Sequence, residues 1–224
     1  VKYSAAQDKI LINPLTIAQA NIGDDTIFKN DHGFENGQKI FYDGNTTQAT
    51  GLTTGTYFVY RISDDAFQLG ETRNDVVNEP PKIVGITTNT GGADQEISLI
   101  NPPISVINNN DLVFYVSDSS LSGFNFNFYY DKLFKNQFVS SGTTSTFSVE
   151  KVGTVGVGTT STVTLKYSKD NPLNIYYAIE KSGFISTTDT DVQNGSRIEF
   201  DDSAVSYTHL RAHETVLDLV CRLL

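Results

Sequence analysis

The chain has 224 residues, with 16 Lys and Arg against 26 Asp and Glu, which gives a formal net charge of −10. An acidic chain without clustered basic residues is poorly suited to bind nucleic acid or an anionic membrane surface. No apolar run is long enough to span a bilayer, so no membrane insertion is expected. Glycine, threonine, serine, asparagine and aromatic residues are plentiful, which is typical of an all-β chain with many turns.

The first hundred residues predict a small β module. Its strands are rich in β-branched and aromatic residues and are bounded by turn signals such as Asp43-Gly44. They are expected over 9–12, 26–28, 38–42, 56–62, 66–69, 83–86 and 96–99. Asn13 and Pro14 are expected to start a short helix over 15–20, with Asn13 as the N-cap. Pro80-Pro81 predicts an extended connector before the last two strands, which flank a turn at 89–92.

Residues 101–203 predict a second unit, because Asn101-Pro102-Pro103 marks a boundary and a new set of short strands follows it. These strands alternate at period two, and none has helical spacing. They are expected over 104–107, 111–116, 124–128 and 163–167, and within 171–185. The prediction is an antiparallel β-sandwich, so the chain holds two small β domains, 1–100 and 101–203.

The last residues resemble translated sequencing adapter. Blocks 205–215 and 219–224 match, in order, the two fixed parts of a transposon-based adapter read in frame, and 216–218 would be the sample index. The alternative is an amphipathic helix. We expect 204–224 to be a non-native tail, and the chain to be an internal fragment of a longer reading frame.

The second unit resembles a cupredoxin-like domain. The resemblance lies in Ser119-Ser120, in 122–126, in a Gly-rich middle hairpin, and in Ile175-Tyr176-Tyr177 leading to 182–184. In copper-binding members these places supply two His, a Cys and a Met. The matching positions here hold Phe124, Ala178, Lys181 and Phe184. None is a normal copper ligand, so the resemblance implies a Greek-key sandwich without metal or other cofactor, with the two phenylalanines filling the pocket.

The first unit resembles a small β module that recurs in phage tail and virion proteins. The residues that carry this resemblance are His32-Gly33-Phe34, 37–42, 50–52, 55–59 and 65–69. Together the two units are similar to very large virion structural proteins of T4-like phages of marine bacteria. The resemblance implies a tail-fibre or baseplate-associated protein that is not an enzyme. Its expected partners are other virion subunits, further copies of the chain, and a host surface glycan or protein.

Candidate catalytic residues fall in predicted turns. Outside the tail, His32 is the only histidine and there is no cysteine, so no Ser-His-Asp or Cys-His constellation can form, although Ser-Lys and carboxylate chemistries stay open. Adjacent residues on a strand point to opposite faces, which makes neighbouring carboxylates a poor acid–base pair. The carboxylate pairs are Asp24-Asp25, Asp64-Asp65 and Asp201-Asp202. They are interpreted as turn residues, and no catalytic, cofactor-binding or metal residue is assigned.

Two loops and one strand contain residue patterns that also occur in ligand-binding sites. Residues 189–195, Asp-Thr-Asp-Val-Gln-Asn-Gly, half resemble a calcium loop, but Gly195 falls one place late and Glu199 one place early. The Gly-rich stretch 153–158 lacks a following Lys-Ser/Thr and predicts a flexible hairpin rather than a phosphate cradle. The alternation of Phe124, Phe126 and Phe128 favours a hydrophobic core over a sugar-stacking platform. Calcium binding at 189–195 stays open.

Three classes of function compete. The favoured one is a virion scaffold that displays loops for host attachment or subunit contacts. The first alternative is a β module of a bacterial cell-surface adhesin. The second is a glycan-degrading tail enzyme, which would need carboxylates that converge in a groove.

Overall fold

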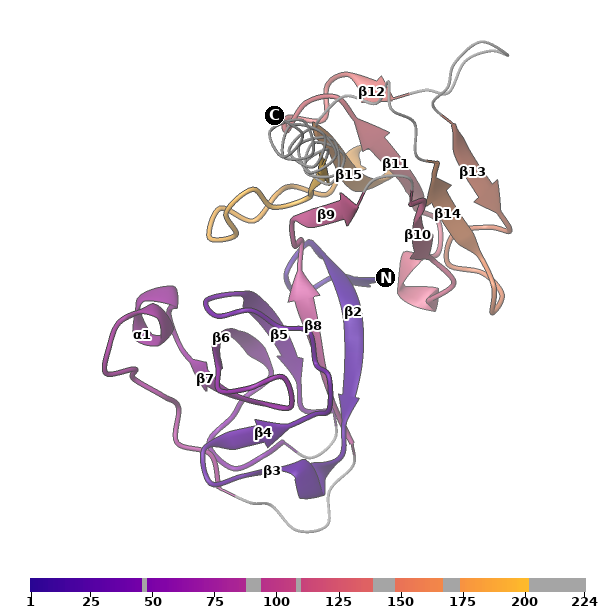
Figure 1. Cartoon of the computed structure of the whole chain (residues 1–224). Coiled ribbons are helices and arrows are strands. Elements are labelled where there is room, and N and C mark those ends of the chain that lie inside the picture. The colour runs from indigo at the N-terminus through magenta and orange to yellow at the C-terminus, as the bar shows by residue number, and fades with distance from the viewer. Residues whose placement is uncertain (46–47, 88–93, 108–109, 139–147, 167–173, 202–224) are drawn as a thin grey trace, which may run out of the picture.

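The computed structural model describes residues 1–45, 48–87, 94–107, 110–138, 148–166 and 174–201. The described chain is all-β, as predicted, and builds three sheets in two regions (Figure 1). Its one α-helix is the short α1, Arg73–Val77. The adapter-like residues and the turn expected at 89–92 lie outside the described residues.

The first region is one eight-stranded antiparallel sheet, in the order β1-β2-β8-β5-β6-β7-β4-β3. The strands are β1 Lys2–Ser4, β2 Lys9–Ile17, β3 Ile22–Gly23, β4 Thr26–Phe28, β5 Lys39–Asp43, β6 Gly55–Arg61, β7 Ala66–Gly70 and β8 Gln95–Ile100. Its core is aliphatic and aromatic, and it is built largely from Ile17, Ile22, Ile27, Phe34, Ile40, Tyr42, Val59, Phe67, Leu69 and Ile97. The predicted strands at 26–28, 38–42, 56–62, 66–69 and 96–99 all form within two residues of their expected bounds.

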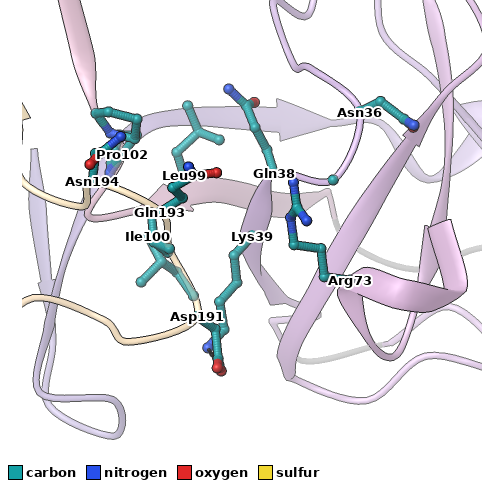
Figure 2. A pocket seen from close by; sticks show the side chains of 13 residues that line it. Asn36, Gln38, Lys39, Arg73, Leu99, Ile100, Pro102, Asp191, Gln193 and Asn194 are labelled. Atoms are coloured by element: carbon teal, nitrogen blue, oxygen red, sulfur yellow. Dashed lines mark hydrogen bonds and ion pairs between the residues drawn. The ribbon is translucent and has the colours of Figure 1, made fainter. Parts of the chain in front are cut away.

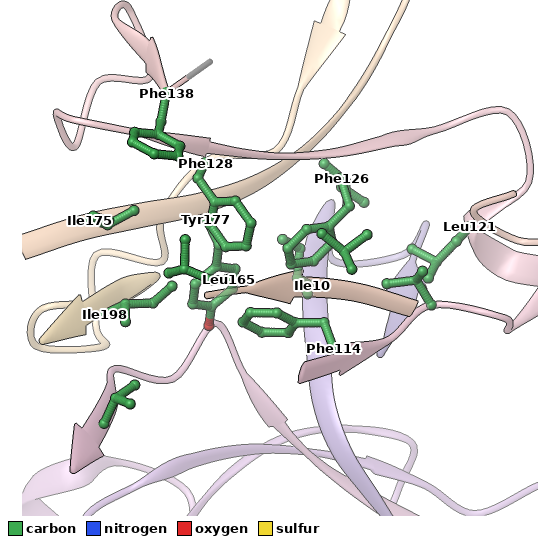
Figure 3. Packing of buried hydrophobic residues seen from close by; sticks show 14 of the residues in the cluster. Ile10, Phe114, Leu121, Phe126, Phe128, Phe138, Leu165, Ile175, Tyr177 and Ile198 are labelled. Atoms are coloured by element: carbon green, nitrogen blue, oxygen red, sulfur yellow. The ribbon is translucent and has the colours of Figure 1, made fainter. Parts of the chain in front are cut away.

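The second region pairs a six-stranded sheet with a three-stranded sheet. The larger has the order β12-β11-β15-β17-β9, with β16 paired to β15, and the smaller has the order β10-β14-β13. The strands are β9 Ile104–Ile107, β10 Leu112–Tyr115, β11 Asn125–Tyr129, β12 Gln137–Phe138, β13 Val149–Val152, β14 Thr162–Leu165, β15 Asn174–Lys181, β16 Phe184–Ile185 and β17 Arg197–Asp201. Figure 3 shows the aromatic core between them, where Phe114 lies 4.7 Å from Phe126 and 5.5 Å from Tyr177, centroid to centroid.

The expectation of purely antiparallel pairing is wrong at one place, because β17 pairs with β9 in parallel. A parallel pair needs a long crossover, and the whole stretch from β10 to β16 separates these two strands. The cupredoxin-like Greek-key arrangement stays a prediction.

The helix expected over 15–20 is wrong. Strand β2 runs through Asn13 and Pro14, and its pairing with β8 shifts register between Ile12 and Leu15. Asn13 has a φ of 53°, and Pro14 has no N–H to donate, so the two residues fit a β-bulge as well as they fit a helix start. Only a 3-10 turn, η1 Gln19–Asn21, follows the strand.

Residues 71–87 also differ from expectation. The segment 83–86 is not a strand, although Val84 N donates to Leu69 O at 2.8 Å and holds the segment beside β7. The short helix α1 precedes it and was not predicted. Thr72 and Asp75 form its capping box: Asp75 N donates to Thr72 Oγ1 at 3.2 Å, and Thr72 N donates to Asp75 Oδ2 at 2.9 Å. A Thr-x-x-Asp pattern is readable in the sequence, but five helical residues leave too little periodicity to detect.

The two regions share a core. Ile10, on β2, is fully buried in the hydrophobic cluster of the second region, and Figure 3 shows it among the labelled side chains of that core. Tyr3 and Ile12 pack against the same cluster. Residues from the start of the chain therefore complete the core of the second region. The division into domains 1–100 and 101–203 stays a prediction.

Candidate functional site

The expected boundary residue Asn101 is a buried hub between the two regions. Its side chain accepts from Ile10 N at 2.8 Å and donates from Nδ2 to Thr187 O at 2.8 Å. Its backbone N–H donates to Ile10 O at 2.9 Å, and its carbonyl accepts from Ser196 N at 2.9 Å. The φ of 39° is left-handed, a conformation that asparagine tolerates better than most residues. Four hydrogen bonds therefore tie β2 and the loops after β16 to the point where the chain changes sheets.

Pro102 accepts a fifth hydrogen bond at this junction. Its carbonyl accepts from the hydroxyl of the fully buried Tyr177 at 2.6 Å. Burial raises the pKa of Tyr177 well above its usual range, so this hydroxyl stays protonated and remains a donor. The segment expected to mark the domain boundary is thus anchored to the core of the second region.

In the calcium-like loop 189–195, the ammonium group of Lys39 lies where a metal ion was considered. Lys39 Nζ lies 3.0 Å from Asp189 Oδ2 and 3.0 Å from Asp191 Oδ2. The Lys39 and Asp189 side chains are each only 10% exposed. Burial by itself would lower the pKa of Lys39, but its hydrogen bonds to Asp191 and Asp189 outweigh burial and raise the pKa. The two carboxylates that would bind calcium are therefore engaged by an ammonium from β5.

A cleft of about 350 Å³ lies beside this ion pair (Figure 2). Its walls come from the start of β5, from α1, from the end of β8 and from the loop before β17. They are lined by Asn36, Gly37, Gln38, Lys39, Arg73, Leu99, Ile100, Pro102, Pro103, Asp191, Val192, Gln193 and Asn194. Arg73 has no ion-pair partner among the described residues, so its guanidinium is available at the wall. The other polar groups of the cleft are mainly carboxamides, which bind through hydrogen bonds but do not act as acids or bases at neutral pH.

A second cavity, of about 600 Å³, shares four of these lining residues and continues along β10. The shared residues are Gln38, Leu99, Pro102 and Pro103. Tyr115 and Val113, on β10, are 67% and 42% exposed at this surface. The junction therefore presents a polar cleft and an apolar groove that meet at the proline pair.

Four positions match copper ligands in the cupredoxin resemblance. Three of them lie close together in the structure, and the fourth does not. Lys181 is paired with Phe184 across β15 and β16, and its Nζ lies 5.4 Å from the centroid of the Phe124 ring. Phe124 and Phe184 are 6.0 Å apart and both are half-buried. Ala178 pairs with Asn127 on the opposite face of β15, as strand alternation requires. Tyr3 joins the two phenylalanines, with its ring 4.8 Å from that of Phe124. That these rings fill the place of a lost copper site stays a prediction.

His32 has a local structural role. Its Nδ1 accepts from Phe34 N at 2.9 Å, so Nε2 carries the proton and donates to Ser63 O at 2.9 Å. The ring is 1% exposed and lies 4.9 Å from the Phe67 ring. The left-handed residues of this turn are its neighbours Asp31 and Gly33 rather than His32 itself.

Two of the three carboxylate pairs lie in turns, as predicted. Asp24 and Asp25 form the two-residue loop between β3 and β4, with φ of 50° and 62°, as a type I′ turn requires. Asp64 and Asp65 connect β6 to β7, and Asp65 Oδ1 accepts from Asp31 N at 2.9 Å. The turn expected at Asp201 is wrong, because Asp201 is the last residue of β17 and pairs with Ile107, while Asp202 lies outside the described residues.

The Gly-rich stretch forms the predicted hairpin connection, between β13 and β14. Gly156 has a φ of 74° and its N–H donates to Val116 O at 2.7 Å. A side chain there would collide with the backbone of Ser122. Phe126 and Phe128 are buried, which confirms their core role, whereas Tyr130 is 50% exposed.

One polar cluster was missed by sequence reasoning. Lys151, Asn127, Glu180 and Tyr129 come from three strands and are linked by hydrogen bonds of 2.6 to 3.1 Å. The signal was weak, because these residues are 22 or more positions apart except for Asn127 and Tyr129. The i, i+2 spacing of that pair was hidden within an aromatic alternation.

Comparisons with protein-family models, with curated proteins and with solved structures find no match to this chain. In the described part of the chain, no group of three or more His, Cys, Asp or Glu is placed to hold a metal. Nor does that part contain a helix that is long and apolar enough to cross a bilayer.

Proposed function

We propose that this chain is part of a virion structural protein, associated with a tail fibre or baseplate, and that it acts as a rigid scaffold rather than as an enzyme. The observation that carries the proposal is the set of buried hydrogen bonds and ion pairs at the junction between the two β regions. Asn101, Tyr177 and the Lys39–Asp189 pair join two β regions that share no strand pairing. A particle component that transmits load or holds loops at fixed distances benefits from such a joint, because hydrogen bonds buried on both sides resist bending.

The residue chemistry of the junction supports binding rather than catalysis. Lys39 is held by two carboxylates, and the remaining polar groups of the cleft are mainly amides and the Arg73 guanidinium. Guanidinium and amide groups suit carboxylates and sugar hydroxyls, which are the groups that host-surface glycans present. The cleft is therefore the surface where we place contact with a host glycan or a neighbouring subunit.

The test starts with the particle. The tryptic peptide 62–73, Ile-Ser-Asp-Asp-Ala-Phe-Gln-Leu-Gly-Glu-Thr-Arg, is a unique marker within this chain. Mass spectrometry of density-purified tailed phages of marine bacteria should detect it, and the parent gene should lie among tail genes. Recovery of the peptide from cell envelopes, with neighbouring genes for surface export, would instead support an adhesin.

The cleft is tested separately on the purified chain. Binding to an array of acidic and neutral bacterial glycans should fall at least several-fold in Arg73→Gln. The matched control is Arg61→Gln, which removes a partly exposed guanidinium that pairs with Asp64 and does not line the cleft. Equal loss in both variants would mean that general charge, and not the cleft, governs binding.

A further inference from the structure

A lysine, an asparagine and a glutamate from three strands are linked by hydrogen bonds, two of them on the six-stranded sheet and one on the three-stranded sheet. Lys151, on β13, donates from Nζ to Asn127 Oδ1, on β11, at 3.1 Å. The Nδ2 group of Asn127 donates to Glu180 Oε1, on β15, at 2.6 Å. Because β13 belongs to the smaller sheet, this chain of contacts crosses from one sheet to the other.

The glutamate is held in place by a further partner. The hydroxyl of Tyr129 donates to Glu180 Oε2 at 2.8 Å. Burial, together with this hydrogen bond, raises the pKa of Tyr129, so the phenol remains a donor at neutral pH. Each carboxylate oxygen of Glu180 thus has a fixed donor, and Oε1 is directed at the amide nitrogen of Asn127.

The surroundings favour a neutral amine. A cavity of about 240 Å³ beside Lys151 is lined largely by Phe126, Phe128, Phe138 and Val149. Lys151 is exposed as a whole residue, yet burial of its ammonium end lowers its pKa, and the charge of Glu180 offsets this only in part. A larger share of Lys151 is therefore an uncharged nucleophile than for a free lysine.

We propose that Lys151 and Asn127 join in an intramolecular isopeptide bond, with Glu180 as the proton carrier. The Lys151 ammonium first loses a proton to water, and neutral Nζ attacks Cγ of Asn127. The attacking nitrogen passes its next proton to Glu180, which delivers it to Nδ2 as the Cγ–Nδ2 bond breaks. The products are a secondary amide and ammonia, which takes up the proton released at the start, so atoms and charge balance without any oxidant or cofactor.

The geometry supplies what this reaction needs. An amine within hydrogen-bonding distance of a carboxamide oxygen lies next to the carbon that it must attack. The two reacting groups are therefore already held together and do not have to meet by diffusion. The carboxylate already touches the leaving nitrogen. The bond would tie β11 to β13 and so staple the two sheets of the second region. This inference does not depend on the proposed function.

The test is the intact mass of the full chain under denaturing conditions. The wild type should weigh about 17 Da less than its sequence requires, the mass of one ammonia. Trypsin should then leave 83–132 joined to 136–166, because cleavage after an acylated Lys151 is blocked. Glu180→Gln and Lys151→Met should both show the full sequence mass and no joined peptide.

Two controls keep the outcome decisive. Glu150→Gln makes the same chemical change one residue from Lys151, at a carboxylate that pairs with Lys166, and should keep the mass loss. An Asn127 succinimide would also lose ammonia, so a mass loss that survives in Lys151→Met overturns the proposal. So does a wild-type chain that retains its full mass after prolonged incubation while showing native circular dichroism.

Discussion

Ile10 and Asn101 hold each other through two hydrogen bonds across 91 residues of sequence. Ile10 N donates to Asn101 Oδ1 at 2.8 Å, and Asn101 N donates to Ile10 O at 2.9 Å. The side chain of Ile10 meanwhile fills the core of the second region. One residue pair therefore joins the start of the chain, the link between the sheets and the larger aromatic core.

Asn101→Ala should destabilise the chain by about 3 kcal/mol, because Ile10 N–H and Thr187 O lose buried partners and alanine is strained at a φ of 39°. Urea unfolding measures the loss. Asn125→Ala, at an exposed position on β11, should stay within about 0.5 kcal/mol. Equal effects would show that Asn101 is not a hub.

Ile10→Ala should cost about 3 kcal/mol through the cavity that it leaves, and it should weaken the second region although Ile10 belongs to the first sheet. Amide hydrogen exchange should accelerate in β11 and β15. A chain limited to 102–203 lacks Ile10, Ile12 and Tyr3 and should bind a hydrophobic dye. A tight, cooperatively folded 102–203 would contradict the shared core and support two independent domains. Ile62→Ala, 51% exposed, is the matched control.

The Lys39 ion pair predicts a pH dependence. Its folded-state pKa is raised above the ordinary 10.5, so its stabilisation is fully present below that pH and is lost as pH rises through the higher folded value. Lys39→Met should cost about 3 kcal/mol at neutral pH, because the largely buried Asp189 loses its counter-charge. The difference from wild type should shrink above pH 10.5. Lys166→Met, in a more exposed ion pair, should cost less than about 1 kcal/mol.

Calcium should leave the wild-type melting temperature unchanged. The Lys39 ammonium already contacts both Asp189 and Asp191, and a bound ion would have to displace it. Differential scanning calorimetry with calcium against a chelator measures this. A rise of several degrees with calcium would revive the loop 189–195 as a metal site.

His32→Phe should destabilise the first region by about 2 kcal/mol. The buried Phe34 N–H loses its acceptor and Ser63 O loses its donor, while ring packing against Phe67 is kept. Thermal unfolding measures the loss. The neighbouring exposed Glu35→Ala should be nearly neutral. If both variants match wild type, the two ring hydrogen bonds contribute nothing to stability.

The sequence alone determined the local structure, because local structure depends on near neighbours. Alternating β-branched and aromatic residues placed β5, β6 and β7, and the Asp24-Asp25 turn followed from residues that tolerate positive φ. The helix expected at Asn13-Pro14 failed for a related reason. Both residues serve a bulge as well as a helix start, and the pairing of β2 with β8, about 85 residues on, decides between them.

Only the tertiary structure decided what the junction does. Asn101-Pro102-Pro103 has the composition of a linker, and 189–195 has the composition of a calcium loop. Their roles depend on Ile10, Tyr177 and Lys39, which lie 75 or more residues away from the groups that they contact. No periodicity or motif reports such contacts, because they are set by how sheets pack and not by the spacing of residues along a strand. The Lys151–Asn127–Glu180 cluster emerged in the same way, from three strands brought together by folding.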